Sequence, residues 1–118
     1  MEESDIIDRA VLDGLLETVG GDREFLGELL QTYFDDAPKL LGAMHAALDA
    51  GDADEFRRAA HSLKSNSNSF GAMQLSRMCK ELEDMGKAGT LEGAGSKIIS
   101  AEEEYTRVRA ALEAATTV

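Results

Sequence analysis

The 118-residue sequence has one cysteine, one proline and no tryptophan, and it contains no long apolar run. A single cysteine, Cys79, cannot form an internal disulfide, and nothing else indicates an oxidising compartment. No apolar segment approaches the roughly 20 residues that a membrane span needs. The first residues, Met1–Asp5, are acidic and lack the basic and apolar parts of a signal peptide. We therefore expect a cytoplasmic protein, or a segment cut from a larger membrane-bound one.

Basic residues are scarce as well: 12 Lys and Arg stand against 23 Asp and Glu, which gives a net charge of −11. Proteins that bind nucleic acid or anionic membranes neutralise many phosphates with basic side chains. The sequence therefore argues against both kinds of partner. The acidic surplus names no partner by itself, because a charged surface is what keeps most domains in solution.

The residues that are abundant favour helices. Apolar residues make up 43% of the chain and charged residues 30%, with many Ala, Leu and Glu. A chain of this length corresponds to a single domain, residues 1–118, with one core. Apolar positions recur with the helical period in five successive segments, which predicts helices over residues 5–19, 22–50, 53–70, 72–85 and 90–112.

Capping and breaking residues lie where these helices should begin and end. Ser4 or Asp5 can cap the first helix, and Thr90 can cap the last. Pro38 interrupts the second helix, but the apolar stripe keeps its register through it, so we expect a kink rather than a split. Four substantial helices with short turns predict an all-α fold: an antiparallel up-down-up-down four-helix bundle, with the short first helix packing across one end.

The segment over residues 59–72 carries the side chains that suggest chemistry. On a helix, an apolar stripe that includes Leu63 packs inward and leaves His61 on the outer side. An exposed imidazole, with an ordinary pKa near 6.5, is largely neutral at pH 7, so one ring nitrogen keeps a lone pair that can attack phosphorus. Lys64 lies three residues later on the same face and could offset the charge of a phosphoryl group.

The neighbours of this histidine suggest a docking surface for another protein. Small residues at Ser65, Ser67 and Ser69 leave room around the imidazole. We expect docking over the exposed side of this helix and the neighbouring end of the long second helix, with contacts from Arg57, Arg58, Ser65 and Asn68. The next helix returns antiparallel, which brings Lys80 and Glu83, on its polar side, within reach of the rim of the site.

One set of positions extends along two of the predicted helices: the run His61-Ser62-Leu63-Lys64, the small residues after it, Gly71-Ala72, Cys79, Leu82 and Glu83. This set resembles the histidine-containing phosphotransfer domain of bacterial and fungal phosphorelays, and the helix layout extends the resemblance over nearly the whole chain. The resemblance implies a four-helix bundle that accepts a phosphoryl group on His61, with Lys64 as the phosphate neighbour, and exchanges it with receiver-domain aspartates. One position departs from the family pattern, since Ser65 stands where glycine is common.

The resemblance also implies partners and the source of the chemistry. The partners would be response-regulator receiver domains or a hybrid histidine kinase. The receiver would bring a Mg²⁺ ion, so we expect no cofactor in this chain. The domain would be a phosphocarrier rather than an enzyme, and we expect a monomer.

Other interpretations of the same residues stay open. A helical interaction domain without phosphotransfer is the main alternative, and a domain phosphorylated directly by a chemotaxis-type kinase is another. The pair Arg57-Arg58 either favours an acidic partner or is solvated charge. His45 has Leu48 at i+3 and borders the apolar stripe, so we predict a partly buried structural residue. Cys79 is predicted to be a small buried apolar residue, and neither histidine has the second histidine or cysteine nearby that a metal site needs.

Overall fold

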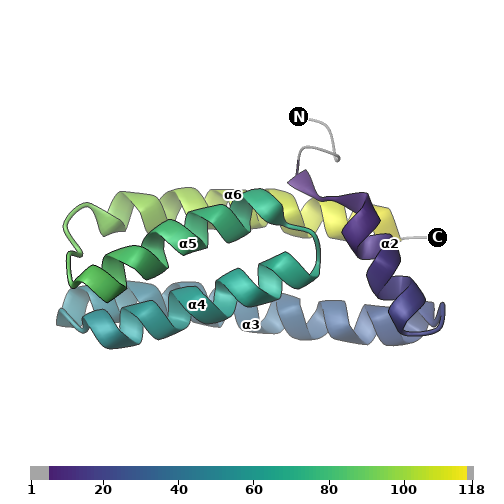
Figure 1. Cartoon of the computed structure of the whole chain (residues 1–118), viewed down its shortest axis with the longest axis horizontal. Coiled ribbons are helices and arrows are strands. Elements are labelled where there is room, and N and C mark those ends of the chain that lie inside the picture. The colour runs from purple at the N-terminus through teal and green to yellow at the C-terminus, as the bar shows by residue number, and fades with distance from the viewer. Residues whose placement is uncertain (1–5, 117–118) are drawn as a thin grey trace.

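The computed structural model describes residues 6–116, which form five helices joined by short turns (Figure 1). The helices are α2 (Arg9–Thr18), α3 (Arg23–Ala50), α4 (Ala53–Ser69), α5 (Met73–Ala88) and α6 (Ala94–Thr116). No strand occurs within residues 6–116. The all-α class predicted from the sequence is confirmed.

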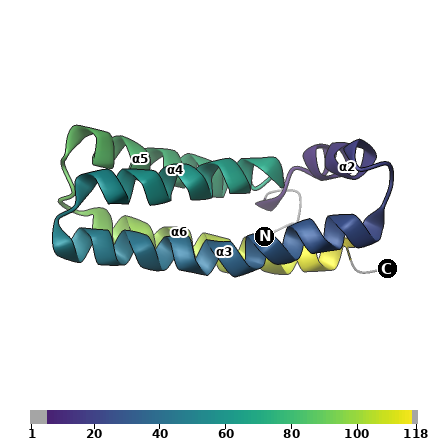
Figure 2. The ribbon, with the colours of Figure 1, turned by 90° about the horizontal axis from the view of Figure 1, so that it is seen from below.

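Helices α3 to α6 form the antiparallel four-helix bundle that the turn lengths predict. Helices α4 and α5 make one layer, which lies over a second layer of α3 and α6 (Figure 2). The hairpin of α4 and α5 is shorter than the pair below it, and α2 packs beside the end of this hairpin against α3 and α4. The described chain measures 43 × 26 × 18 Å, so the bundle is elongated along its helices.

A cluster of aromatic side chains anchors the C-terminal half of α4 to the rest of the bundle. The ring of Tyr33 on α3 lies 5.0 Å from that of Phe70 and 5.8 Å from that of Tyr105 on α6, measured between centroids. The Tyr33 hydroxyl also lies 2.9 Å from Oγ of Ser67, which is fully buried. Aromatic pairs at these distances add about 0.5–1.5 kcal/mol each beyond burial, so the helix that carries His61 is firmly held.

Helix α2 begins at Arg9, within the segment 5–19 that the sequence predicts to be one helix. Its N-cap is Asp8, whose carboxylate accepts a hydrogen bond from the Ala10 amide at 3.0 Å. The amide of Asp8 donates to the carbonyl of Gly71 at 2.8 Å, which holds the chain extended across the turn between α4 and α5. Because Ile6 is itself helical, the predicted helix over residues 5–19 is interrupted at Ile7 and Asp8, and the predicted caps Ser4 and Asp5 lie outside the described residues.

The prediction that Thr90 caps the last helix is wrong, because α6 begins at Ala94. The Thr90 amide donates to the carbonyl of Met85 at 3.1 Å, behind a left-handed Gly89 with φ 71°. Thr90 therefore completes the C-terminal cap of α5, which runs to Ala88 rather than Met85.

The long helix α3 continues through Pro38 without a break, so the helix is not split there. The predicted kink stays a prediction. At its C-terminal end, Gly51 adopts a left-handed conformation with φ 68°, and the Asp52 carboxylate caps α4 by accepting from the Glu55 amide at 3.0 Å. The turn lies at residues 51–52, between the helices predicted over 22–50 and 53–70, and it aligns α4 antiparallel to α3.

Candidate functional site

His61 lies in the middle of α4 with 55% of its side chain exposed. Its neighbours Ala60 and Leu63 are fully buried, so the inward stripe of α4 is the one that the sequence predicts. The prediction that the imidazole reaches solvent is confirmed. Exposure alone does not make His61 a phosphoacceptor, because that role also depends on the groups around the ring.

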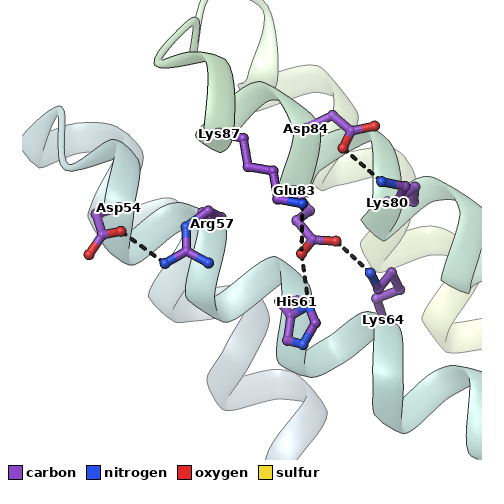
Figure 3. A network of polar contacts seen from close by, with 8 residues as sticks. All are labelled: Asp54, Arg57, His61, Lys64, Lys80, Glu83, Asp84 and Lys87. Carbon is purple, nitrogen blue, oxygen red and sulfur yellow. Dashed lines mark hydrogen bonds and ion pairs between the residues drawn. The ribbon is translucent and has the colours of Figure 1, made fainter.

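The exposed ring is held by a buried carboxylate from the neighbouring helix (Figure 3). One oxygen of Glu83, Oε2, lies 2.7 Å from His61 Nδ1, and the other, Oε1, lies 2.6 Å from the Lys64 ammonium. Only 3% of the Glu83 side chain is exposed. The sequence correctly predicts that Glu83 comes near His61, but it wrongly places this carboxylate on the solvent side.

The close approach of α4 and α5 explains why Glu83 is buried. Gly86 lies inside α5, just beyond the predicted end of this helix at residue 85. A Cβ atom placed there would come within 2.8 Å of the Arg57 Cβ and 2.9 Å of its Cα. The helices therefore touch one turn beyond Glu83. At this separation the carboxylate fits between the helices, where His61 and Lys64 satisfy both of its oxygens.

Glu83 is ionised at neutral pH despite its burial. Burial raises the pKa of this carboxyl, but the hydrogen bonds from Lys64 and His61 outweigh that effect and lower the pKa from 4.5 to about 2. An ionised carboxylate can only accept hydrogen bonds, so the proton of a neutral imidazole is assigned to Nδ1. The lone pair is then on Nε2, the nitrogen that points away from the polar network in Figure 3.

The surface beside His61 is an open hollow between α3 and α4. Asp36, Lys39 and Leu40 line it on the α3 side, and Ser62, Ser65 and Asn66 line it on the α4 side. It thus combines the His61 face of α4 with the middle of α3, whereas the sequence analysis expects docking contacts at an end of this long helix. Asn66 and the three α3 residues were not singled out from the sequence, because periodicity alone does not say which residues of two helices meet.

Three of the four predicted docking residues, Arg58, Ser65 and Asn68, are exposed. Ser65 lines the hollow beside His61 and also a second hollow between α4 and α5, and Asn68 lines only the second. The prediction that Ser67 leaves room around the imidazole is wrong. Its side chain points into the core, where its hydroxyl lies against that of Tyr33. Ser69 is exposed, but its hydroxyl donates to the Ser65 carbonyl at 3.1 Å.

The predicted pair Arg57 and Arg58 lies one turn before His61 and is engaged with acidic residues of its own helix. Each guanidinium lies 3.0 Å from a carboxylate oxygen of Asp54. The hydrogen bond from Arg57 and the charge of Arg58 lower the pKa of Asp54. Arg57 also packs its backbone against Gly86, so its contribution to the contact between α4 and α5 is direct.

The remaining candidates have structural surroundings. His45 is half-buried, with Nε2 3.1 Å from Glu102, and Cys79 is fully buried, which raises the pKa of its thiol to about 12. Both predictions of a structural residue agree with these positions. Over residues 6–116, no group of three His, Cys, Asp or Glu side chains could hold a metal ion, and no helix is long and apolar enough to cross a membrane.

Comparison with known proteins gives consistent matches. The family model described as Hpt domain matches residues 28–115. Histidine-containing phosphotransfer protein 2 of Arabidopsis thaliana is 28% identical over 96 residues, which cover 79% of this chain and 62% of that protein. Multistep phosphorelay regulator 1 of Schizosaccharomyces pombe is 27% identical over 94 residues, 79% of this chain and 32% of that protein. The chain thus spans less than two thirds of the length of these curated relatives.

Solved structures show the same similarity in three dimensions. The crystal structure of histidine-containing phosphotransfer protein B (HptB) from Pseudomonas aeruginosa PAO1 superposes with a TM-score of 0.86 at 36% identity, and 94% of each chain is covered. The phosphotransfer protein ZmHP2 from maize superposes with a TM-score of 0.82 at 24% identity, over 97% of this chain and 85% of that one. At 24% identity, the similarity to ZmHP2 shows a shared fold and nothing more.

Proposed function

The chain belongs to the Hpt domain family, and on this premise we propose that it is a phosphorelay intermediate that accepts a phosphoryl group on His61 and exchanges it with aspartates of receiver domains. The observation that carries the proposal is the exposed imidazole whose Nδ1 is held by a buried, ionised Glu83. This arrangement leaves a lone pair on Nε2 at the surface. Family members are phosphocarriers rather than catalysts. We propose the same role for this chain, acting as a single domain and a monomer.

The transfer step requires no proton removal from the attacking nitrogen. The Nε2 lone pair attacks the phosphorus of an aspartyl phosphate, a P–N bond forms, and the P–O bond to the aspartate breaks. The bonding electron pair stays on the aspartate carboxylate of the receiver. The imidazole becomes positively charged with its proton still on Nδ1, and the same steps in reverse return the phosphoryl group to a receiver.

Glu83 and Lys64 would favour this step in different ways. Glu83 fixes the reactive tautomer and stabilises the positive charge that develops on the ring, and a hydrogen bond to a charged group contributes about 1.5–3 kcal/mol. Lys64 lies at i+3 from His61 and would offset the charge of the phosphoryl group. A Mg²⁺ ion and in-line geometry would come from the receiver, so this chain supplies the nucleophile, local charge and docking surface.

The hollow between α3 and α4 is the place where we expect the receiver to dock. It is open, lies directly beside His61, and offers Leu40 as an apolar contact between polar residues. Ser65 at its edge is small enough for close approach. A receiver of a response regulator or of a hybrid histidine kinase fits the same chemistry, because both present a phosphorylatable aspartate.

The proposal is tested by phosphorylation from a receiver. The native chain, a His61→Gln variant and a matched His45→Gln variant are incubated with a phosphorylated receiver, and the label is tested for acid lability and base stability. We expect acid-labile, base-stable label on the native chain and on His45→Gln, and none on His61→Gln. Because His61 is exposed, circular dichroism should show that its variant folds normally.

Two outcomes would contradict the proposal. Label retained in His61→Gln would place the acceptor elsewhere. No label on the native chain with any of several receivers would favour the helical interaction domain that binds without phosphotransfer.

A further inference from the structure

Glu83 has a third basic neighbour that the transfer step above does not use. The ammonium of Lys87 lies 3.9 Å from Glu83 Oε2, one turn further along α5 (Figure 3). At this distance the two charges attract without a hydrogen bond. A lysine four residues after a glutamate has the favourable orientation for an ion pair on a helix, and 54% of the Lys87 side chain is exposed and free to move.

The phosphorylated state creates a competition for Lys64. In the unphosphorylated chain, Lys64 is the full cation in hydrogen-bond contact with Glu83, since a neutral His61 offers only its N–H. A phosphoryl group on Nε2 adds close to two negative charges on the same face of α4. Lys64 would then be drawn away from Glu83. The positively charged imidazole still donates to Oε2, but the buried Oε1 loses its hydrogen-bond partner, and an unpaired buried carboxylate oxygen costs free energy.

We propose that Lys87 is a positioning residue that takes over the ion pair with Glu83 when Lys64 turns to the phosphoryl group on His61. This inference rests on the proposed function. By keeping Glu83 ionised and in place, Lys87 preserves the hydrogen bond to Nδ1 in the phosphorylated state. Lys64 can therefore serve the phosphoryl group without leaving Oε1 of Glu83 unpaired.

Other basic residues of α4 and α5 are already engaged. Lys80 lies 2.9 Å from Asp84, and Arg57 lies 3.0 Å from Asp54. In the part of the chain that the structure describes, the lysines that form ion pairs with Glu83 are Lys64 and Lys87. Lys87 is thus the cation that needs the smallest movement to replace Lys64.

The experiment compares Lys87→Gln and Lys87→Arg with a matched control, Lys97→Gln. Lys97 is similarly exposed, at 47%, and forms a comparable long ion pair, 3.6 Å to Glu81, away from His61. The measured quantity is the equilibrium ratio of phosphorylated chain to phosphorylated receiver over pH 6–9. We expect Lys87→Gln to lower this ratio about two- to fivefold, the range that a partly exposed ion pair supports, with no change in Lys97→Gln and recovery in Lys87→Arg.

A second background separates this role from a direct effect of Lys87 on the receiver. Glu83→Gln keeps the shape of the side chain and an oxygen that can accept from Nδ1, but it has no charge that needs a cation. In this background we expect Lys87→Gln to leave the ratio unchanged. An equal loss in both backgrounds, or no loss in the native background, would overturn the inference, whereas a native chain that takes no label would refute the proposed function instead.

Discussion

At the scale of single residues, the side chain that organises the site is Glu83. It joins the two residues of α4 that the sequence singles out, His61 and Lys64, through its two oxygens. Its burial makes each hydrogen bond stronger than it would be in water, and it also makes the loss of either partner costly. The chemistry of an exposed histidine therefore depends on a carboxylate that solvent barely reaches.

The lowered pKa of Glu83 predicts how stability depends on pH. The folded-state pKa of about 2 lies below the ordinary 4.5, so this group stabilises the fold fully above about pH 5, and the contribution is lost as pH falls toward 2. The loss amounts to at most roughly 3 kcal/mol. Urea unfolding of the native chain and of Glu83→Gln from pH 7 to pH 3 measures it as the change in the difference between the two free energies of unfolding.

The outcome has a clear sign. The native chain should lose its stability advantage over Glu83→Gln as the pH is lowered. A difference that stays constant over this range would mean that Glu83 titrates normally.

The sequence predicts the exposure of His61 correctly because the stripe through Leu63 is long and regular. It does not predict the burial of Glu83. Helical periodicity assigns this residue to the polar side of α5, and only the distance between two helices decides whether a polar side is covered. That distance is set by Gly86 against the Arg57 backbone, a contact between positions far apart in the sequence.

At the scale of the helices, the contact of α4 with α5 controls the geometry of the site. Gly86 allows the two backbones to approach, and Glu83 lies one turn away on the same helix. The helix ends show the same dependence on tertiary contacts. The predicted first helix is interrupted at Ile7 and Asp8, and the hydrogen bond from Asp8 to Gly71 that holds this extended segment cannot be seen in the sequence.

We predict that Gly86→Ala both destabilises the fold and impairs phosphorylation. The added Cβ would lie 2.8–2.9 Å from Arg57 backbone and Cβ atoms, so α5 must shift, at a cost of about 1–3 kcal/mol for overpacking. The gain in helix propensity, about 1 kcal/mol, offsets only part of this cost. Thermal unfolding and the rate of labelling from a phosphorylated receiver measure the two effects.

Gly42→Ala is the matched control. Gly42 also lies inside a helix, α3, but an added Cβ there meets nothing within 4 Å. This variant should be as stable as the native chain or more stable, by up to about 1 kcal/mol. Equal behaviour of the two alanine variants would show that the close contact at Gly86 does not constrain the site.

At the scale of the whole molecule, charge is distributed unevenly. Helices α4 and α5 carry five carboxylates and also half of the chain's 12 basic residues, namely Arg57, Arg58, Lys64, Arg77, Lys80 and Lys87. The two helices that present His61 therefore carry a net charge of +1, while the rest of the chain, with 6 basic and 18 acidic residues, carries −12. Under the proposed function, an acidic phosphorylation pocket of a receiver would be repelled less at this layer than over the rest of the chain.

The uneven charge predicts a salt-dependent effect at Lys39, which lines the hollow beside His61 on the α3 side. Lys39→Glu should slow association with a receiver several-fold at low ionic strength, and the effect should shrink as salt is added. Stopped-flow binding at several salt concentrations measures it. Arg23→Glu changes the net charge equally but lies about four turns away along α3, so it should have a much smaller effect. Similar slowing by both variants would indicate repulsion between net charges only.

The bundle as a whole follows from helix lengths and short turns, which leave few ways to connect four amphipathic helices. The layers and the neighbours of α4 are therefore predictable without any long-range information. The hollow beside His61 is less predictable from the sequence. Asp36 and Leu40 line it only because of the way α3 and α4 are aligned along their lengths. A periodic pattern specifies which face of a helix is inside, but not how far two helices slide along each other.

The exposure of His61 finally has a consequence in time. A phosphoryl group carried on a ring that is 55% exposed stays in contact with water from the moment the donor leaves. Under the proposed function, hydrolysis then runs in parallel with the search for an acceptor. The stored signal expires unless a receiver arrives first, so the concentration of receivers sets how much of each signal survives.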